Sequence, residues 1–72
     1  MTTAAEVGGR LRDTMVKRGV SQKYIAEKMG VTRQTLAARL AGASDFNVSE
    51  IAAITDALKL TRDERDEIFF GL

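Results

Sequence analysis

The stretch SQKYIAEKMGVTRQTLAARLAG, residues 21–42, decides the fold of this chain. Its apolar positions recur at helical spacing in two groups, and they are Ile25, Ala26, Met29, Leu36 and Leu40. Ser21 and Thr32 stand before the two groups as helix caps, whereas Gly30 and Gly42 stand after them as helix terminators. The stretch therefore predicts two short helices joined by the turn MGVT, which contains a glycine.

The part of the chain before this stretch is also predicted to be helical. The 72 residues include no proline and no sustained alternation of apolar and polar residues. Val7, Leu11 and Met15 share one face, which predicts a first helix over about residues 5–18. Gly8 and Gly9 each cost roughly 1 kcal/mol relative to alanine inside a helix, so we expect the helix to fray at this pair or to begin after it.

Two further helices are predicted after the loop GASDFN. Asn47 or Ser49 begins the fourth helix, which carries a narrow apolar stripe. Thr61 begins the fifth helix, with acidic residues in its first turn. The predicted fold class is therefore all-α, as one compact five-helix domain over residues 1–72 with a helix-turn-helix at about residues 21–41.

The composition excludes several classes of function. The chain has no cysteine and no histidine, which removes disulfides, thiolate metal sites and the commonest general base. No nucleophile–base pair is visible in so small a chain. We therefore expect no enzyme activity, no cofactor and no metal site. No targeting pattern or membrane-length apolar run is present, so we expect a soluble, cytoplasmic protein.

The net charge of +1 conceals an asymmetry along the chain. Residues 1–42 carry eight basic and three acidic side chains, a net charge of +5. Residues 43–72 carry three basic and seven acidic side chains, a net charge of −4. A basic first part suits a polyanionic partner such as DNA. The alternative is that the charges belong to two solvated faces of opposite sign.

Two helices joined by a short turn that contains glycine form a helix-turn-helix, whose second helix can enter the major groove of DNA. The residues quoted above resemble the DNA-binding domain of the lambda repressor/Cro-like (XRE) family, in particular its small phage or prophage regulators of the Cro and CI type. The resemblance continues through SDFNVSEIAAITDALKLTRDERDEIFF and covers nearly the whole chain from residue 10. It implies five helices, transcriptional control and dimeric binding to a palindromic operator.

The second helix of the motif offers a small polar face to a groove. Its two leucines define the buried side, and the candidates for base reading lie near the helix start and on the other side. These candidates are Arg33, Gln34, Thr35 and Ala38. Arg33 can pair with guanine and Gln34 with adenine. Thr35 or Ala38 can contact a thymine methyl group.

A second set of residues is expected to contact the DNA backbone. Ser21, Gln22 and Lys23 begin the first helix of the motif, where free backbone amides bind phosphate well. By the resemblance, Gln22 matches a glutamine that contacts phosphate. Thr32 and Ser44 flank the second helix and join this set. The alternative for Ser21 and Gln22 is that they only cap the helix.

Arg39 departs from the family pattern, which prefers an apolar residue at this position. It lies roughly 80° from the centre of the Leu36/Leu40 face, at the border of the core. Leu40 can supply the packing that Arg39 does not. We favour the interpretation that the guanidinium contacts a DNA phosphate, and the alternative is an ion pair within the protein.

The ending IFFGL carries more apolar side chains than a small core readily holds, and they are Ile68, Phe69, Phe70 and Leu72. Adjacent phenylalanines on a helix point about 100° apart, so we expect one ring to pack inward and the other to lie on the surface. An exposed ring beside Leu72 would form a partner surface, which we interpret as the interface of a two-fold dimer. The alternative is that both rings cap the core of the monomer.

The function predicted is a sequence-specific DNA-binding transcriptional regulator, in particular a Cro-like repressor because no second domain follows. Its expected partners are a double-stranded DNA operator and a second copy of the chain. One alternative is a modulator that uses the same fold to bind a partner repressor or a polymerase. Another is an antitoxin that regulates its own two-gene module.

Overall fold

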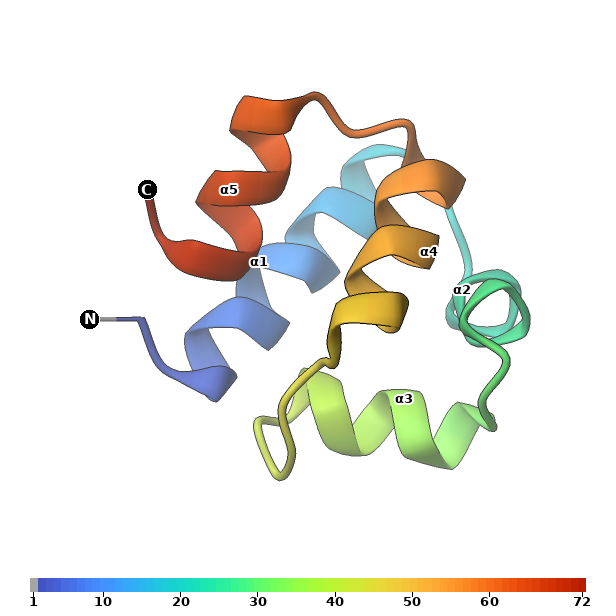
Figure 1. Ribbon diagram of the computed structural model, residues 1–72. Coiled ribbons are helices and arrows are strands. Elements are labelled where there is room, and N and C mark those ends of the chain that lie inside the picture. Colours follow the sequence, from blue (N-terminus) through green and yellow to red (C-terminus); the bar gives the residue numbers. More distant parts are fainter. Residues whose placement is uncertain (1) are drawn as a thin grey trace.

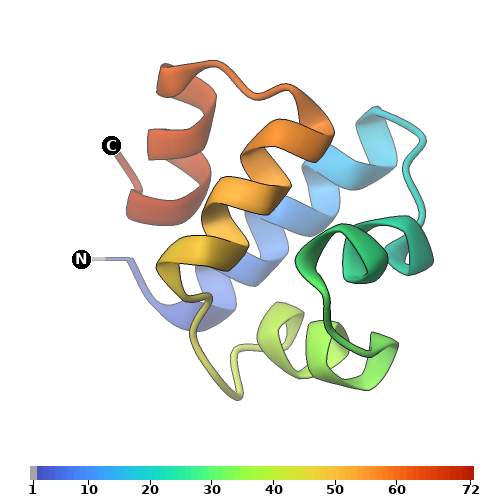
Figure 2. The ribbon, with the colours of Figure 1, turned by 45° about the vertical axis from the view of Figure 1, so that its right-hand side comes forward.

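Five helices and no strand make up residues 2–72, the part of the chain described by the computed structural model (Figure 1). The helices are α1 (Ala4–Lys17), α2 (Gln22–Met29), α3 (Arg33–Leu40), α4 (Val48–Leu58) and α5 (Arg62–Phe70). The predicted all-α, five-helix fold is therefore confirmed. Figures 1 and 2 both place α3 at one end of the molecule, far from the start of α5.

Each helix begins at a hydroxyl or amide cap whose side-chain oxygen accepts a backbone N–H three residues on. The caps are Thr3, Ser21, Thr32, Asn47 and Thr61. In three of them a glutamate three residues later also accepts from the cap's own amide, which completes a capping box. The sequence left the fourth cap open between two residues, and it is Asn47.

One apolar core joins all five helices. Its buried members are Val7, Leu11, Met15, Ile25, Ala26, Leu36, Leu40, Ile54, Leu58, Leu60, Ile68 and Phe69. α1 packs against both α3 and α5, while α2 packs against α3 and α4. α3 is thus held chiefly by the two helices that precede it in the chain.

Both glycines of the first helix lie inside α1, which neither frays at the pair nor begins after it. Gly8 is buried where α1 crosses the end of α3, and a Cβ placed on it would overlap the Leu40 carbonyl group and lie 2.8 Å from the Leu40 Cα. Gly42 makes the reciprocal approach, since its Cβ would lie 2.7 Å from the Ala5 nitrogen. The expectation that the helix frays at this pair or begins after it was wrong, because Gly8 permits a close backbone contact with α3 that an alanine would block.

The two neighbouring glycines therefore give opposite predictions for substitution by alanine. Gly8→Ala should lower the free energy of unfolding by about 1–3 kcal/mol, because the added methyl group forces α1 and α3 apart. Gly9→Ala should raise it by about 0.5–1 kcal/mol, since nothing lies within 4 Å of its Cβ and alanine favours the helix. Urea unfolding of both variants measures the difference, and a Gly8→Ala variant as stable as Gly9→Ala would contradict the close approach.

Candidate nucleic-acid interface

The turn between α2 and α3 fixes the angle of the helix-turn-helix. Gly30 takes the left-handed backbone conformation, with φ 73°, and the amide of Val31 donates to the Ala26 carbonyl at 3.0 Å. Thr32 then caps α3 by accepting from the Thr35 amide at 3.1 Å. Ala26 is buried, which lets the two helices approach closely. Figure 1 looks nearly along α2 and shows α3 below it, lying sideways in the view.

The solvent face of α3 holds part of the predicted base-reading set. Arg33 and Gln34 are exposed at its N-terminal end, whereas Thr35 and Ala38 are half-buried. The Thr35 hydroxyl also accepts a hydrogen bond from the Thr32 hydroxyl at 3.1 Å. Ala37, which the sequence reasoning did not single out, is exposed beside them. Arg33 and Gln34 are thus the long polar side chains that α3 presents outward.

The predicted phosphate contacts at the start of α2 are accessible. Ser21 and Lys23 are exposed and Gln22 is half-buried. The Ser21 hydroxyl oxygen caps the helix by accepting from the Tyr24 amide at 3.0 Å. Amides of the first helical turn that have no partner within a helix can bind an anion. Because Ser21 accepts from only one of these amides, the others remain available to a phosphate.

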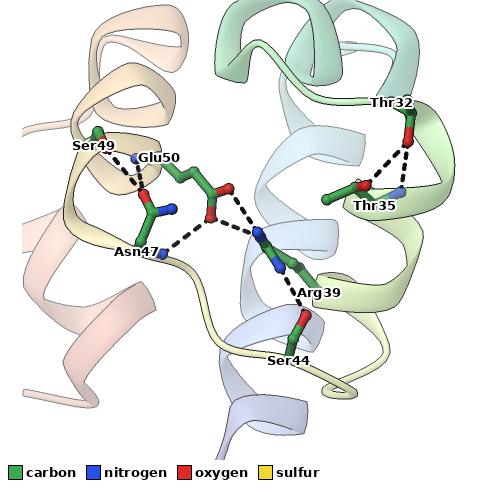
Figure 3. A network of polar contacts seen from close by, with 7 residues as sticks. All are labelled: Thr32, Thr35, Arg39, Ser44, Asn47, Ser49 and Glu50. Carbon is green, nitrogen blue, oxygen red and sulfur yellow. Dashed lines mark hydrogen bonds and ion pairs between the residues drawn. The ribbon is translucent and has the colours of Figure 1, made fainter.

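Arg39 forms the ion pair that the sequence analysis gave as its alternative (Figure 3). Its Nε donates to Glu50 Oε1 at 2.7 Å and its Nη2 to Glu50 Oε2 at 2.9 Å. Its Nη1 donates to the Ser44 hydroxyl at 2.7 Å. Glu50 Oε1 also accepts a hydrogen bond from the backbone amide of Asn47 at 3.0 Å. A phosphate contact by Arg39 or Ser44 stays a prediction, because here both side chains bond within the protein.

The sequence reasoning did not find Glu50. Its signal was local, since a glutamate three residues after Asn47 is the spacing of a capping box. The carboxylate makes that bond and accepts the Arg39 guanidinium as well. An arginine at a core-border position has to find an acceptor, and this glutamate on the next helix is within reach.

Glu50 is the buried charged residue of the described chain, with 5% of its surface exposed. Burial by itself would raise its pKa, but the hydrogen bonds from Arg39 and Asn47 and the charge of Arg39 outweigh burial and lower the pKa from its ordinary 4.5. The pKa values of Glu6 and Glu64 are lowered too, first by the hydrogen bonds from the amides of Thr3 and Thr61. The carboxylate form is thus the one that the fold stabilises at all three positions.

Because these folded-state pKa values lie below the unfolded ones, their contribution to stability is complete above the ordinary pKa of 4.5. It is lost as the pH falls through the lower, folded-state values. We expect the urea midpoint to fall steadily as the pH is lowered from 5 towards ~3. Glu50→Gln should lose less stability over the same range, since it lacks one of the three groups. An identical acid dependence in this variant and the unaltered chain would contradict the assignment.

Two other arginines of the first 42 residues also form hydrogen bonds within the protein. Arg10 Nε donates to the Ile68 carbonyl at 3.0 Å, in the last turn of α5. Arg18 donates to the Leu58 carbonyl at the end of α4 and pairs with Glu64 at 2.6 Å. Cations at helix C-termini stabilise the helix dipole. The excess positive charge of the first 42 residues is therefore partly structural.

At the end of α5 the two phenylalanines point to different environments, as predicted. Phe69 is buried and packs edge-on against Phe46, with ring centroids 5.7 Å apart. Phe70 is 52% exposed and Leu72 is 85% exposed. Ile68 is buried in the core. Of the four residues predicted for a dimer interface, only Phe70 and Leu72 thus offer surface to a partner.

None of the helices described in residues 2–72 is long and apolar enough to cross a membrane. Over the same residues, acidic side chains form no cluster of three or more that could hold a metal ion.

A short helix fixed by a tight turn on a preceding helix, with its N-terminal side chains open to solvent, defines the helix-turn-helix class. A family model described as "Helix-turn-helix domain" matches residues 6–68, so the chain belongs to that family. Family membership supports DNA binding in transcription regulation. No curated protein and no solved structure gives a significant match to the chain.

Proposed function

We propose that this protein is a sequence-specific DNA-binding transcriptional regulator that places α3 in the major groove. The observation that carries the proposal is the outward position of Arg33 and Gln34 on a helix fixed by the turn at Gly30. Side chains at the N-terminal end of a recognition helix are the ones that reach base edges. The family match over residues 6–68 supports the same role.

Each of the four candidate base-reading residues then has a chemical role. Arg33 donates to the two acceptors of a guanine, and Gln34 pairs with an adenine edge. Thr35 and Ala38, half-buried and small, let the helix approach a thymine methyl group. The phosphate set is Ser21, Gln22, Lys23 and Thr32, which lie at the starts of α2 and α3.

In its finer form the proposal is a Cro-like repressor of phage or prophage origin, acting in the cytoplasm as a homodimer on a palindromic operator. The exposed Phe70 and Leu72 support the dimer. Phe70 also lines a pocket of about 300 Å³, together with Phe46 and Phe69. We call the surface formed by Phe70 and Leu72 the apolar edge. A second copy of the chain that covered it would give the two-fold symmetry that a palindrome requires.

Footprinting on the gene's own upstream region, followed by titration of the protected sequence, tests the DNA-binding proposal. Arg33→Ala and Gln34→Ala should each cost about 1–3 kcal/mol of specific binding and relax the base preference at one position. Arg62→Ala, at the start of α5 and far from α3, is the matched control and should bind as the unaltered chain does. Equal losses on operator and random DNA would contradict base reading by these two residues.

Sedimentation velocity tests the dimer. Phe70→Ser should be a monomer at concentrations at which the unaltered chain sediments as a dimer, because the apolar edge has lost its largest group. Val16→Ser removes another exposed apolar side chain, from α1, and should leave the dimer intact. If the unaltered chain is a monomer both alone and on an operator half-site pair, the dimer proposal fails.

One observation favours the second candidate, a protein-binding modulator. The chain carries no lysine or arginine between Leu40 and Leu58, and the loop there exposes Asp45. DNA-binding affinity depends heavily on cations near phosphates, so this flank of α3 contributes little to it. A modulator would show no specific footprint alone and would bind DNA only beside a partner repressor or polymerase.

A further inference from the structure

We propose that Arg39 and Glu50 are positioning residues, whose ion pair holds the recognition helix α3 against the start of α4 and so sets the orientation of its reading face. In this proposal Arg39 acts through Glu50 and does not clamp a phosphate. The expected effect on operator binding rests on the proposed function, whereas the expected effect on the orientation of α3 concerns the protein alone.

The pair connects three segments of the chain at one point (Figure 3). Arg39 lies in the last turn of α3, Glu50 in the first turn of α4, and Ser44 in the loop between them. Arg39 donates to both oxygens of Glu50 and to the Ser44 hydroxyl. Glu50 and Asn47 in turn exchange bonds at 3.0 and 2.8 Å, which fixes the first turn of α4. A bidentate pair of this kind permits few relative orientations of its two groups.

Other contacts hold α3 only from its remaining sides. α3 packs chiefly on α1 and α2, and the backbone contact of Gly8 with Leu40 lies on the α1 side. An eight-residue helix is not stable alone, so its orientation depends on what it touches. On the side that faces α4, the direct polar link is the Arg39–Glu50 pair. Loss of the pair would therefore leave α3 held chiefly by α1 and α2, without its polar link on the side that faces α4.

The electrostatics also oppose a role of Arg39 as a phosphate clamp. Only 18% of the Arg39 side chain and 6% of the Glu50 side chain are exposed. The carboxylate neutralises the guanidinium at contact distance, so the pair offers a phosphate almost no net charge. Breaking the pair from either side leaves a buried charge without its partner, which the fold can relieve only by moving.

The two roles of Arg39 give opposite predictions for Glu50→Gln. If the pair positions α3, both Glu50→Gln and Arg39→Ala should weaken operator binding about tenfold, with non-specific binding and the salt dependence unchanged. The effects should not add in the double variant, and Arg39→Lys should restore part of the affinity. If Arg39 clamps a phosphate, Glu50→Gln should free it and leave binding as tight or tighter. Arg39→Ala should then reduce the salt slope by about 1, and either result overturns the inference.

Amide hydrogen exchange of the free protein tests the structural side without DNA. Arg39→Ala and Glu50→Gln should each speed exchange severalfold in the last turn of α3 and in the loop after it, with α2 unchanged. Glu64→Gln is a matched control, because Glu64 also closes a capping box and also pairs with an arginine, Arg18, far from α3. Its exchange in α3 should equal that of the unaltered chain.

The two measurements separate the two possible failures. An unaltered chain with no specific DNA binding contradicts the proposed function, and the exchange rates still decide whether the pair holds α3. Exchange in α3 that is unchanged in both Arg39→Ala and Glu50→Gln overturns the inference, even where the chain binds its operator as proposed.

Discussion

The backbone contact between α1 and α3 is the constraint on which the rest of the structure depends. Gly8 lies against the carbonyl group of Leu40, and Gly42 lies against the backbone of Ala5. Main-chain atoms meet here, so no change of side-chain rotamer can adjust the distance between the two helices. With α3 fixed at this distance, Leu36 and Leu40 enter the core fully while Arg33, Gln34 and Ala37 stay exposed. A requirement for close packing thus decides which residues of α3 remain free to meet a ligand.

The helices and their starts follow from the sequence because caps and apolar spacing act over a few residues. The environments of the residues on either side of the apolar face of α3 do not follow from the sequence, because a helical wheel treats the two sides of such a face alike. Ala37 and Arg39 lie about equally far from the centre of the Leu36/Leu40 face. In the structure Ala37 is exposed, whereas α4 covers Arg39 through Glu50. The tertiary arrangement decides which of these two sides is covered. It therefore decided the surroundings of Arg39, the residue that departs from the family pattern.

The partners of the basic side chains were the hardest feature to predict, for a similar reason. Arg10 donates to a carbonyl 58 residues away and Arg18 to one 40 residues away, and neither distance leaves a local signal. Arg10 lies on α1 and Arg18 is its C-cap residue, and both stabilise the C-terminal ends of other helices. Nor is Lys28 fully free, since its ammonium lies 5.4 Å from the centre of the Tyr24 ring. Because Arg18 and Arg39 are paired with glutamates, the excess of basic residues in the first part of the chain overstates the charge that a nucleic acid would meet.

An apolar residue at position 39 would bury more apolar surface than an arginine does, and replacing a buried ion pair by apolar residues is often neutral or stabilising. The advantage of the arginine lies in geometry. Apolar contacts permit a range of helix tilts, whereas a guanidinium that meets both oxygens of one carboxylate permits few. Base recognition needs side chains held to within a fraction of an ångström, so a helix that reads DNA gains more from a fixed orientation than from additional burial. Since Glu50 already belongs to the capping box of α4, the helix start and the orientation of α3 depend on the same carboxylate.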